Sequence, residues 1–137
     1  LHPTIPYIKP QLKHAKSVRK TKAREKKRRE FSEYKGVWLF ALFDLPVDTA
    51  ETRRSYTKFR NALIKMGFSM LQYSVYARYF NSEESCEPYR KRIRQALPTE
   101  GQVRLLAVTD KQFGKMEVYS GKKQKEVEEP PPQLMLF

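Results

Sequence analysis

Cysteine and histidine are nearly absent from this sequence of 137 residues, and their scarcity limits the chemistry open to it. The one cysteine, Cys86, excludes an internal disulfide and any zinc cluster built from cysteines. The two histidines, His2 and His14, both lie near the N-terminus. A histidine general base or a Cys–His pair in the rest of the chain is therefore excluded. Any catalysis must depend on carboxylates and a hard metal ion.

Long apolar runs and acidic charge are also scarce. The sequence has no apolar run of about 18 residues and no signal-peptide core, so we expect a soluble, cytoplasmic protein without a membrane partner. The formal net charge is +13. An excess of this kind favours a polyanion, because each Lys or Arg that meets a phosphate releases a condensed counterion. A nucleic acid is therefore the expected partner.

The positive charge is concentrated near the N-terminus. Residues 1–35 carry 12 Lys or Arg and 3 Asp or Glu, a net of +9, whereas residues 36–137 carry 16 and 12, a net of +4. Residues 1–35 are proline-rich at first and then basic without an apolar stripe, which predicts an N-terminal arm. The arm is either flexible and solvated, ordered on nucleic acid, or a segment not native to the protein. We expect the folded domain over residues 36–121.

The first patterned segment is GVWLFALFDLP, which predicts a strand over Val37–Leu45 that Pro46 ends. Asp48 is the expected N-cap of a following helix, because Glu51 stands three residues later at capping-box spacing. The apolar stripe of this helix consists of Tyr56, Phe59, Leu63 and Met66.

Four further segments follow. Residues Phe68–Phe80 alternate with a period of two and predict a second strand. A second helix is expected between Ser85 and Leu97, with Ser85 rather than Ser82 as its cap, so that Pro88 falls in the first turn. GQVRLLAVTD predicts a third strand and KMEVYSG a short fourth. Residues 122–137 read as a charged linker followed by the apolar segment QLMLF, a terminal strand.

These elements predict an α+β protein of order β-α-β-α-β-β, whose two helices cover one face of a four-stranded sheet. The first strand is nevertheless apolar on both of its faces. Leaving the second face in water would forfeit about 25 cal/mol for each Å² of apolar area, so a homodimer packed sheet against sheet is the simplest cover. Asp44 has the same parity as Trp38, Phe40 and Leu42, and is expected to point toward that junction.

Four short matches in the right order carry a family resemblance. The strand ending in FDLP, the helix TAETRRSYTKFRNALIKMGF, the segment LQYSVYARYF and the strand running into RLLAVTDKQF resemble the CRISPR-associated Cas-two family of nucleases. The similarity covers about residues 36–137. Arg53 or Arg54 matches a basic position early in the first helix, and Gln72 and Ser74 match a Q-x-S-V pattern. Tyr76 stands where a Phe is common, and the long basic arm is atypical.

The resemblance implies a ferredoxin-like domain that dimerises through its sheet, with the C-terminal strand packed against the partner protomer. It implies a metal-dependent endonuclease on RNA or DNA, with an aspartate, here Asp44, that binds a divalent metal such as Mg²⁺. It also implies a place in spacer acquisition, where the dimer bridges the CRISPR integrase and holds the duplex DNA protospacer.

Asp44 is thus the candidate catalytic residue and metal ligand. One carboxylate per chain makes a poor metal site, but a two-fold axis near Asp44 would bring a second copy into reach. The alternative is that Asp44 bonds backbone N–H groups of the next turn. Asp48 is expected as a helix cap and Asp110 as a turn residue.

Basic side chains on the two helices are candidates for contacts with the nucleic-acid backbone, which carry little sequence information. The alternative is a solvated face. Aromatic side chains of the second strand, including Tyr73, are expected in the core or the dimer contact rather than as base-stacking platforms. The candidate nucleic-acid-binding residues are Arg53, Arg54, Lys58, Lys65, Arg90, Arg92 and Arg94.

Three functions remain open from the sequence. The first is a homodimeric Mg²⁺-dependent nuclease. The second is a purely structural scaffold that binds DNA and the integrase without catalysis. The third is a generic ferredoxin-like RNA-binding protein with exposed aromatics on its sheet, which the doubly apolar first strand disfavours.

Overall fold

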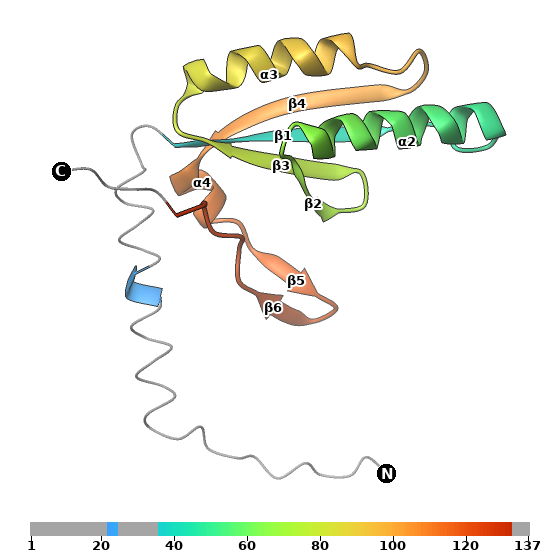
Figure 1. Cartoon of the computed structure of the whole chain (residues 1–137). Helices are drawn as coiled ribbons and strands as arrows, with labels where there is room; N and C mark the ends of the chain where they lie inside the picture. The colour runs from blue at the N-terminus through green and yellow to red at the C-terminus, as the bar shows by residue number, and fades with distance from the viewer. Residues whose placement is uncertain (1–21, 25–35, 133–137) are drawn as a thin grey trace, which may run out of the picture.

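The computed structural model describes residues 22–24 and 36–132, and its main body is an antiparallel sheet with two long helices (Figure 1). The predicted arm lies mostly outside these residues, and the terminal QLMLF segment lies wholly outside them. The elements are β1 (Val37–Asp44), α2 (Ala50–Lys65), β2 (Ser69–Gln72), β3 (Val75–Phe80), α3 (Glu83–Gln95), β4 (Gln102–Thr109), α4 (Asp110–Gly114), β5 (Val118–Ser120) and β6 (Lys123–Lys125).

The four-stranded sheet has the order β2-β3-β1-β4, and every neighbouring pair is antiparallel. Both β-α-β units are split, because β3 lies between β1 and β2, and β1 lies between β3 and β4. This is the ferredoxin-like arrangement. The predicted α+β ferredoxin-like fold is confirmed, with α2 and α3 on the same side of the sheet (Figure 1).

The predicted order of the elements is corrected at residues 68–80, which form the hairpin β2–β3 instead of one strand. The order within the sheet is therefore β-α-β-β-α-β. Ser74 adopts the left-handed region, with φ of 62°, in a turn that contains no glycine, asparagine or proline. The turn is held by tertiary contacts, since the Phe43 N–H donates to the Ser74 carbonyl at 3.1 Å. The alternation of apolar and polar residues over positions 68–80 does not indicate such a turn.

Both helix starts differ from the prediction. Thr49, not Asp48, is the N-cap of α2, and its hydroxyl accepts from the Thr52 N–H at 3.1 Å. Ser82, not Ser85, caps α3, and the two serines form a reciprocal capping box. Pro88 therefore lies in the second turn of α3. Because proline has no backbone N–H, the helix lacks one backbone hydrogen bond there. In both helices a hydroxyl at N3 closes the capping box, and in α2 it is Thr52 rather than the expected Glu51 that does so.

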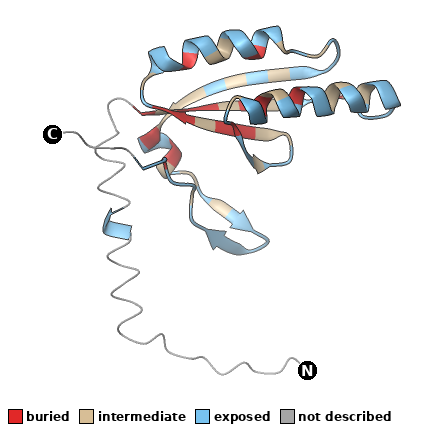
Figure 2. Cartoon of the chain, viewed as in Figure 1, coloured by how far each residue is buried: buried red, intermediate tan, exposed pale blue. Residues whose placement is uncertain are grey.

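The main core lies between the sheet and its two helices (Figure 2). Odd-numbered residues of β1 point into it, and Leu39 and Ala41 have no exposed surface. Phe59 and Leu63 enter it from α2, and Ile93 enters it from α3. Phe59 and Leu63 belong to the apolar stripe that the sequence predicts for the first helix.

The opposite face of the sheet is only partly exposed to solvent. This corrects the expectation that a single chain would leave the whole of that face exposed. Phe113 of α4 stacks on Trp38 with ring centroids 4.0 Å apart and an interplanar angle of 7°. Met116 and Val127 also pack against this second cluster. Beside Phe40, in the middle of the same face, Leu106 is 52% exposed. The chain covers the Trp38 end itself and leaves the Asp44 end open.

The predicted fourth strand lies outside the main sheet. Val118–Ser120 pairs with Lys123–Lys125 in a separate two-stranded hairpin, below α4 in Figure 1. Its second strand falls within the segment expected to be a linker. In the part of the chain described here, no helix is both long and apolar enough to cross a membrane.

Candidate functional site

Asp44 ends β1 on the open face of the sheet, opposite Gln102 of β4. Pro46, two residues after Asp44, prevents the strand from continuing. Gly101 packs closely against the backbone of Asp44. Its φ is +92°, and a Cβ at this position would lie 2.6 Å from the Asp44 carbonyl oxygen. The Asp44 side chain is exposed, and within residues 22–24 and 36–132 it makes no hydrogen bond or ion pair. The alternative role, bonding the next turn, is therefore not seen.

Asp44 lines a hollow of about 240 Å³ at the end of the sheet. Three separate elements build it: the end of β1, the start of β4 and the β2–β3 turn. Its lining residues are Leu42, Phe43, Asp44, Tyr73, Ser74, Val75, Gln102 and Arg104.

One chain does not complete a metal site here. Among the described residues, no group of three or more His, Cys, Asp or Glu side chains is placed to hold a metal ion. Asp44 alone offers the carboxylate oxygen that Mg²⁺ prefers. The prediction that a second copy must contribute a ligand remains a prediction.

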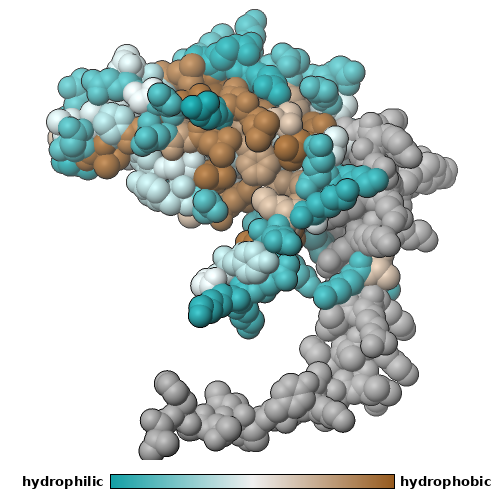
Figure 3. Space-filling view, turned by 180° about the vertical axis from the view of Figure 1, so that it is seen from behind, coloured by the Kyte–Doolittle hydropathy of each residue, from teal (hydrophilic) through white to brown (hydrophobic). Residues whose placement is uncertain are grey.

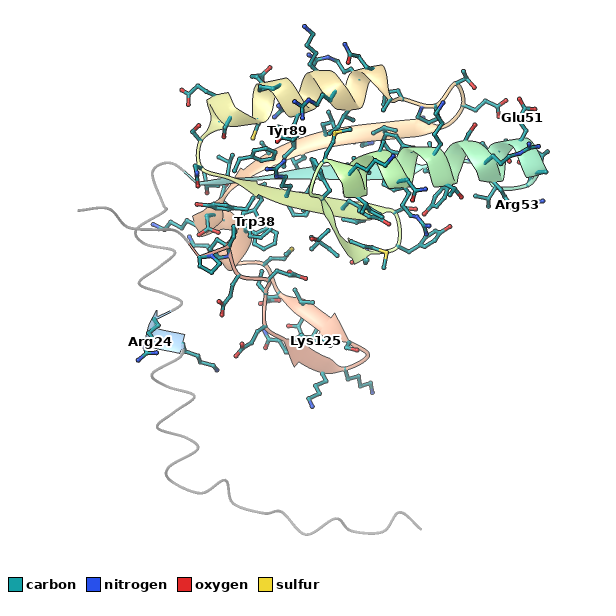
Figure 4. The ribbon with its side chains drawn as sticks, in the orientation of Figure 1. Arg24, Trp38, Glu51, Arg53, Tyr89 and Lys125 are labelled. Atoms are coloured by element: carbon teal, nitrogen blue, oxygen red, sulfur yellow. The ribbon has the colours of Figure 1, made fainter. Side chains whose placement is uncertain are left out.

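The candidate residues on α2 lie together. Arg53, Arg54, Lys58 and Lys65 all line one shallow surface hollow of about 730 Å³ along the helix. Arg53 projects outward at the N-terminal end of α2 (Figure 4). Apart from hydrogen bonds of Arg53 to the Val47 carbonyl and of Arg54 to its own helix, these cations have no partners in the described chain. They form one basic surface, which we call the α2 basic face.

The candidate residues on α3 do not form a single surface. Arg90 is half-buried and pairs with Glu87 at 3.4 Å between Nε and Oε1. The Arg92 guanidinium lies 4.9 Å from the centroid of the Tyr89 ring. Arg94 is exposed. Because successive residues turn by about 100° around a helix, Arg92 points away from the side that Arg90 and Arg94 share.

The aromatic residues of the hairpin divide into two groups. Tyr76, Tyr79 and Phe80 are buried, as expected. Tyr73 is 72% exposed at the turn, and its ring stacks on Tyr56 with centroids 5.9 Å apart. Hydrogen bonding with Tyr56 and the charge interaction between the two phenols raise the pKa of Tyr73. The Tyr73 phenol is therefore neutral at physiological pH.

Two residues of the hollow, Arg104 and Tyr73, were not in the predicted site. Arg104 lies on β4 across from Leu42, one step along from the pair formed by Asp44 and Gln102 on the same face. A sequence signal existed, since Arg104 is the one charged residue in β4. Its proximity to Asp44 depends on the strand register, which the sequence did not give.

Comparison with known proteins identifies the family. Residues 37–116 match the family model described as CRISPR associated protein Cas2. A protein of Parvibaculum lavamentivorans named "CRISPR-associated endoribonuclease Cas2" is 46% identical over 101 residues, which cover 74% of this chain and all of that protein.

Two further relatives carry the same name. The protein of Flavobacterium psychrophilum is 43% identical over 106 residues, covering 77% of this chain and 92% of its own length. The protein of Ligilactobacillus salivarius is 49% identical over 89 residues, covering 65% of this chain and 88% of its own length. The resemblance drawn from four sequence segments is confirmed, and the chain belongs to the CRISPR-associated protein Cas2 family.

Proposed function

We propose that this protein is a cytoplasmic CRISPR adaptation protein that acts as a homodimer, binds duplex DNA, bridges the integrase and hydrolyses phosphodiester bonds at Asp44. Membership of the Cas2 family and the relatives' printed name, endoribonuclease, support a nuclease. One observation carries the assignment to Asp44. Its side chain is exposed and unpaired among the described residues, and Asp44 and Arg104 line the same hollow.

The donor chemistry at Asp44 fits half of a magnesium site. Mg²⁺ keeps several waters and is usually held by one or two carboxylates together with substrate phosphates. Asp44 from each of two copies would supply those carboxylates. When bound, the ion polarises the phosphodiester and lowers the pKa of a coordinated water. The protein's own part is to hold the carboxylates at rigid strand ends, where Gly101 packs against the Asp44 backbone.

The open end of the sheet supports the proposed dimer. Apolar side chains gather over the body of the domain when it is seen from behind (Figure 3). Leu42 and Leu106 lie on the open face of the sheet by their register, and Leu106 is 52% exposed. A second copy packed here would cover both leucines and bring the two Asp44 side chains toward a shared axis. The edge of β4 that does not face β1 could receive the partner's C-terminal segment, residues 133–137.

The α2 basic face supports the proposed binding of duplex DNA. Four cations on a single helix can follow a phosphate backbone without reading bases. The basic residues of α3 contribute at most through Arg90 and Arg94, which share one side of that helix. We also propose that the N-terminal arm adds to this attraction through its net charge of +9.

The test compares the wild-type protein with Asp44→Asn on labelled single-stranded RNA and duplex DNA, in Mg²⁺ and in EDTA. We expect cleavage by the wild type in Mg²⁺ alone and none by Asp44→Asn. Equal cleavage by the two proteins would exclude the role of Asp44. Sedimentation of both proteins at micromolar concentration tests the dimer in the same preparation.

The alternative function is a scaffold that holds DNA and the integrase without catalysis. It is favoured by the lack of any carboxylate cluster among the described residues. The two functions differ in their response to substitution at Asp44. A scaffold would support integration of a protospacer equally well with Asp44→Asn, but would lose it when Arg53, Arg54 and Lys58 are replaced by glutamate.

A further inference from the structure

Two arginines from different elements lie against one tyrosine ring on the helix side of the sheet. The guanidinium of Arg78, on β3, lies 4.2 Å from the centroid of the Tyr89 ring of α3, and that of Arg92, one turn further along α3, lies 4.9 Å from it. We propose that these three side chains form a binding site for a phosphate monoester. They line neither the hollow beside Asp44 nor the α2 basic face, so this site goes beyond the proposed function.

Arg78 is held in place before any ligand arrives. It is half-buried, and its Nη1 donates to the Met66 carbonyl at 2.6 Å. Its guanidinium also lies 4.7 Å from the centroid of the Phe80 ring. A guanidinium has five N–H donors, so the single bond to Met66 leaves donors for a ligand. Because the side chain is already ordered, it loses little conformational entropy on binding.

The other two side chains open the site to solvent. Tyr89 projects from α3 toward the sheet and is half-buried (Figure 4). Arg92 is exposed, and it lies on the side of α3 away from Arg90 and Arg94. An anion in solution can therefore reach both Arg92 and the hydroxyl of Tyr89.

The two positive charges are not neutralised by the protein. Within residues 22–24 and 36–132, neither Arg78 nor Arg92 forms an ion pair. Glu87, an acid of the same helix, pairs instead with Arg90, at 3.4 Å between Oε1 and Nε. Two cations that lie against one ring repel each other. A bound anion would remove this repulsion.

The potential at the Tyr89 hydroxyl already favours negative charge. A hydrogen bond from Arg78, then the charge of Arg78, and then the charge of Arg92 lower the pKa of Tyr89. At pH 7 the phenol keeps its proton, so its O–H remains a donor for a ligand. An anion beside this hydroxyl would be stabilised by the same two guanidinium groups.

The number of charges selects a phosphate monoester. Such a group carries about −1.5 to −2 charges at pH 7 and so matches two guanidinium groups. A carboxylate or a phosphodiester carries a single charge and would leave one cation unpaired. The planar forks of arginine also fit the oxygens of a phosphate in a bidentate manner. Phosphate monoesters occur on free nucleotides and at the ends of nucleic-acid strands, and the same three side chains would bind either.

The test is isothermal titration calorimetry of the full chain with adenosine 5′-monophosphate in EDTA. Arg92→Gln and Tyr89→Phe should each weaken binding about 10-fold or more, the effect of losing one hydrogen bond to a charged group. Tyr89→Phe retains the ring against which both arginines lie. Lys91→Gln is the matched control, because Lys91 is an exposed cation next to Arg92, and it should change the affinity by less than about twofold. Adenosine and 3′,5′-cyclic AMP should bind more weakly than the monoester.

A second measurement separates a binding site from a purely structural cluster. A bound phosphate should raise the pKa of Tyr89, since a neighbouring anion disfavours the phenolate. Carbon NMR of ring-labelled tyrosine follows this titration, with the Tyr89 resonance identified by its loss in Tyr89→Phe. We expect the nucleotide to raise the pKa in the wild type and in Lys91→Gln, but not in Arg92→Gln. A cluster with only a structural role would titrate identically with and without the nucleotide.

Competition with a DNA duplex identifies the source of the phosphate. If a duplex with 5′-phosphates displaces the nucleotide and the same duplex with 5′-hydroxyls does not, the ligand is a strand end. If neither duplex displaces it, the ligand is a free nucleotide. Equal displacement by both would assign the arginines to the phosphodiester backbone and overturn the monoester site. The site is also overturned if the wild type does not bind millimolar nucleotide, if Arg92→Gln binds as the wild type does, or if Lys91→Gln loses as much affinity as Arg92→Gln.

Discussion

The indole Nε1–H of Trp38 donates a hydrogen bond to the Asp110 carboxylate at 2.7 Å, and both side chains are buried. Asp110 also opens α4, whose Phe113 stacks on the Trp38 ring. The hydrogen bond and the ring stacking hold α4 against the sheet at Trp38 (Figure 4). Asp110 is therefore neither a simple turn residue nor exposed enough to act on a substrate.

Removing the acceptor of this bond should destabilise the fold. In Asp110→Ala the Trp38 N–H is left buried without its partner, which costs about 1–3 kcal/mol. Urea unfolding followed by tryptophan fluorescence measures the change, since Trp38 is the sole tryptophan. Asp110→Asn keeps an acceptor oxygen and should lose clearly less. Equal losses in the two variants would mean that the charge of Asp110, rather than its hydrogen bond, stabilises the protein.

Arg78 joins three elements of the main core. Its Nη1 donates to the Met66 carbonyl at the end of α2 at 2.6 Å, and its guanidinium lies 4.2 Å from the Tyr89 ring centroid and 4.7 Å from that of Phe80. Hydrogen bonding to Arg78, and then the charge of Arg78, lower the pKa of Tyr89. The folded state therefore favours the Tyr89 phenolate more than the unfolded chain does.

A lowered pKa gives a defined pH dependence. The contribution of Tyr89 to stability is absent at pH 7, where the phenol is neutral in both states. It increases as the pH rises through the folded pKa and is complete above the unfolded value of 10.0. We expect the difference in unfolding free energy between wild type and Tyr89→Phe to be larger at pH 10.5 than at pH 7. In an Arg78→Met background that increase should disappear, and its persistence would exclude Arg78 as the cause.

The sequence predicted the elements wherever local patterns were complete. The apolar strand β1, the stripe of α2 and the strand β4 were placed correctly, because burial on one face imposes a period that a single segment displays. The fold class and the family followed from these elements and from four motifs. The face of the sheet that carries Asp44 was also correct, since parity along one strand suffices to assign it.

The remaining features depend on contacts between distant residues. The turn at Ser74 has no turn-forming residue and is held by Phe43 and Tyr56. The partial cover of the second face depends on Phe113 reaching Trp38 from 75 positions along the chain. Arg104 became a neighbour of Asp44 only through the register of β1 and β4. None of these relationships leaves a pattern within one segment.

Asp44→Asn should remove cleavage without reducing stability. The side chain is exposed and makes no contact within the described chain that the amide would break, so we expect the free energy of unfolding to change by less than about 0.5 kcal/mol. Urea unfolding and an RNA cleavage assay on one preparation measure both quantities. A large loss of stability would instead identify Asp44 as a structural residue and would leave its catalytic role without support.

Charge reversal on α2 should weaken binding of duplex DNA. Replacing Arg53, Arg54 and Lys58 by glutamate removes three phosphate contacts, so the slope of log K against log salt should fall in magnitude by about 2.7. Fluorescence anisotropy with a labelled duplex measures this slope. The same triple change at Lys122, Lys123 and Lys125 on the β5–β6 hairpin is the charge-matched control. Equal slopes for the two triple variants would mean that only net charge, and not the α2 basic face, determines the affinity.

A charge in the middle of the open sheet face should separate the proposed dimer. Leu106 and Ile64 are both 52% exposed, but Leu106 lies on the sheet beside Phe40, whereas Ile64 lies on α2. Leu106→Asp would bury a carboxylate between copies, and we expect the dissociation constant to rise by roughly 30-fold or more. Ile64→Asp should sediment as the wild type does. If Leu106→Asp remains a dimer, the two copies meet elsewhere, and a metal site shared between two Asp44 carboxylates loses its structural basis.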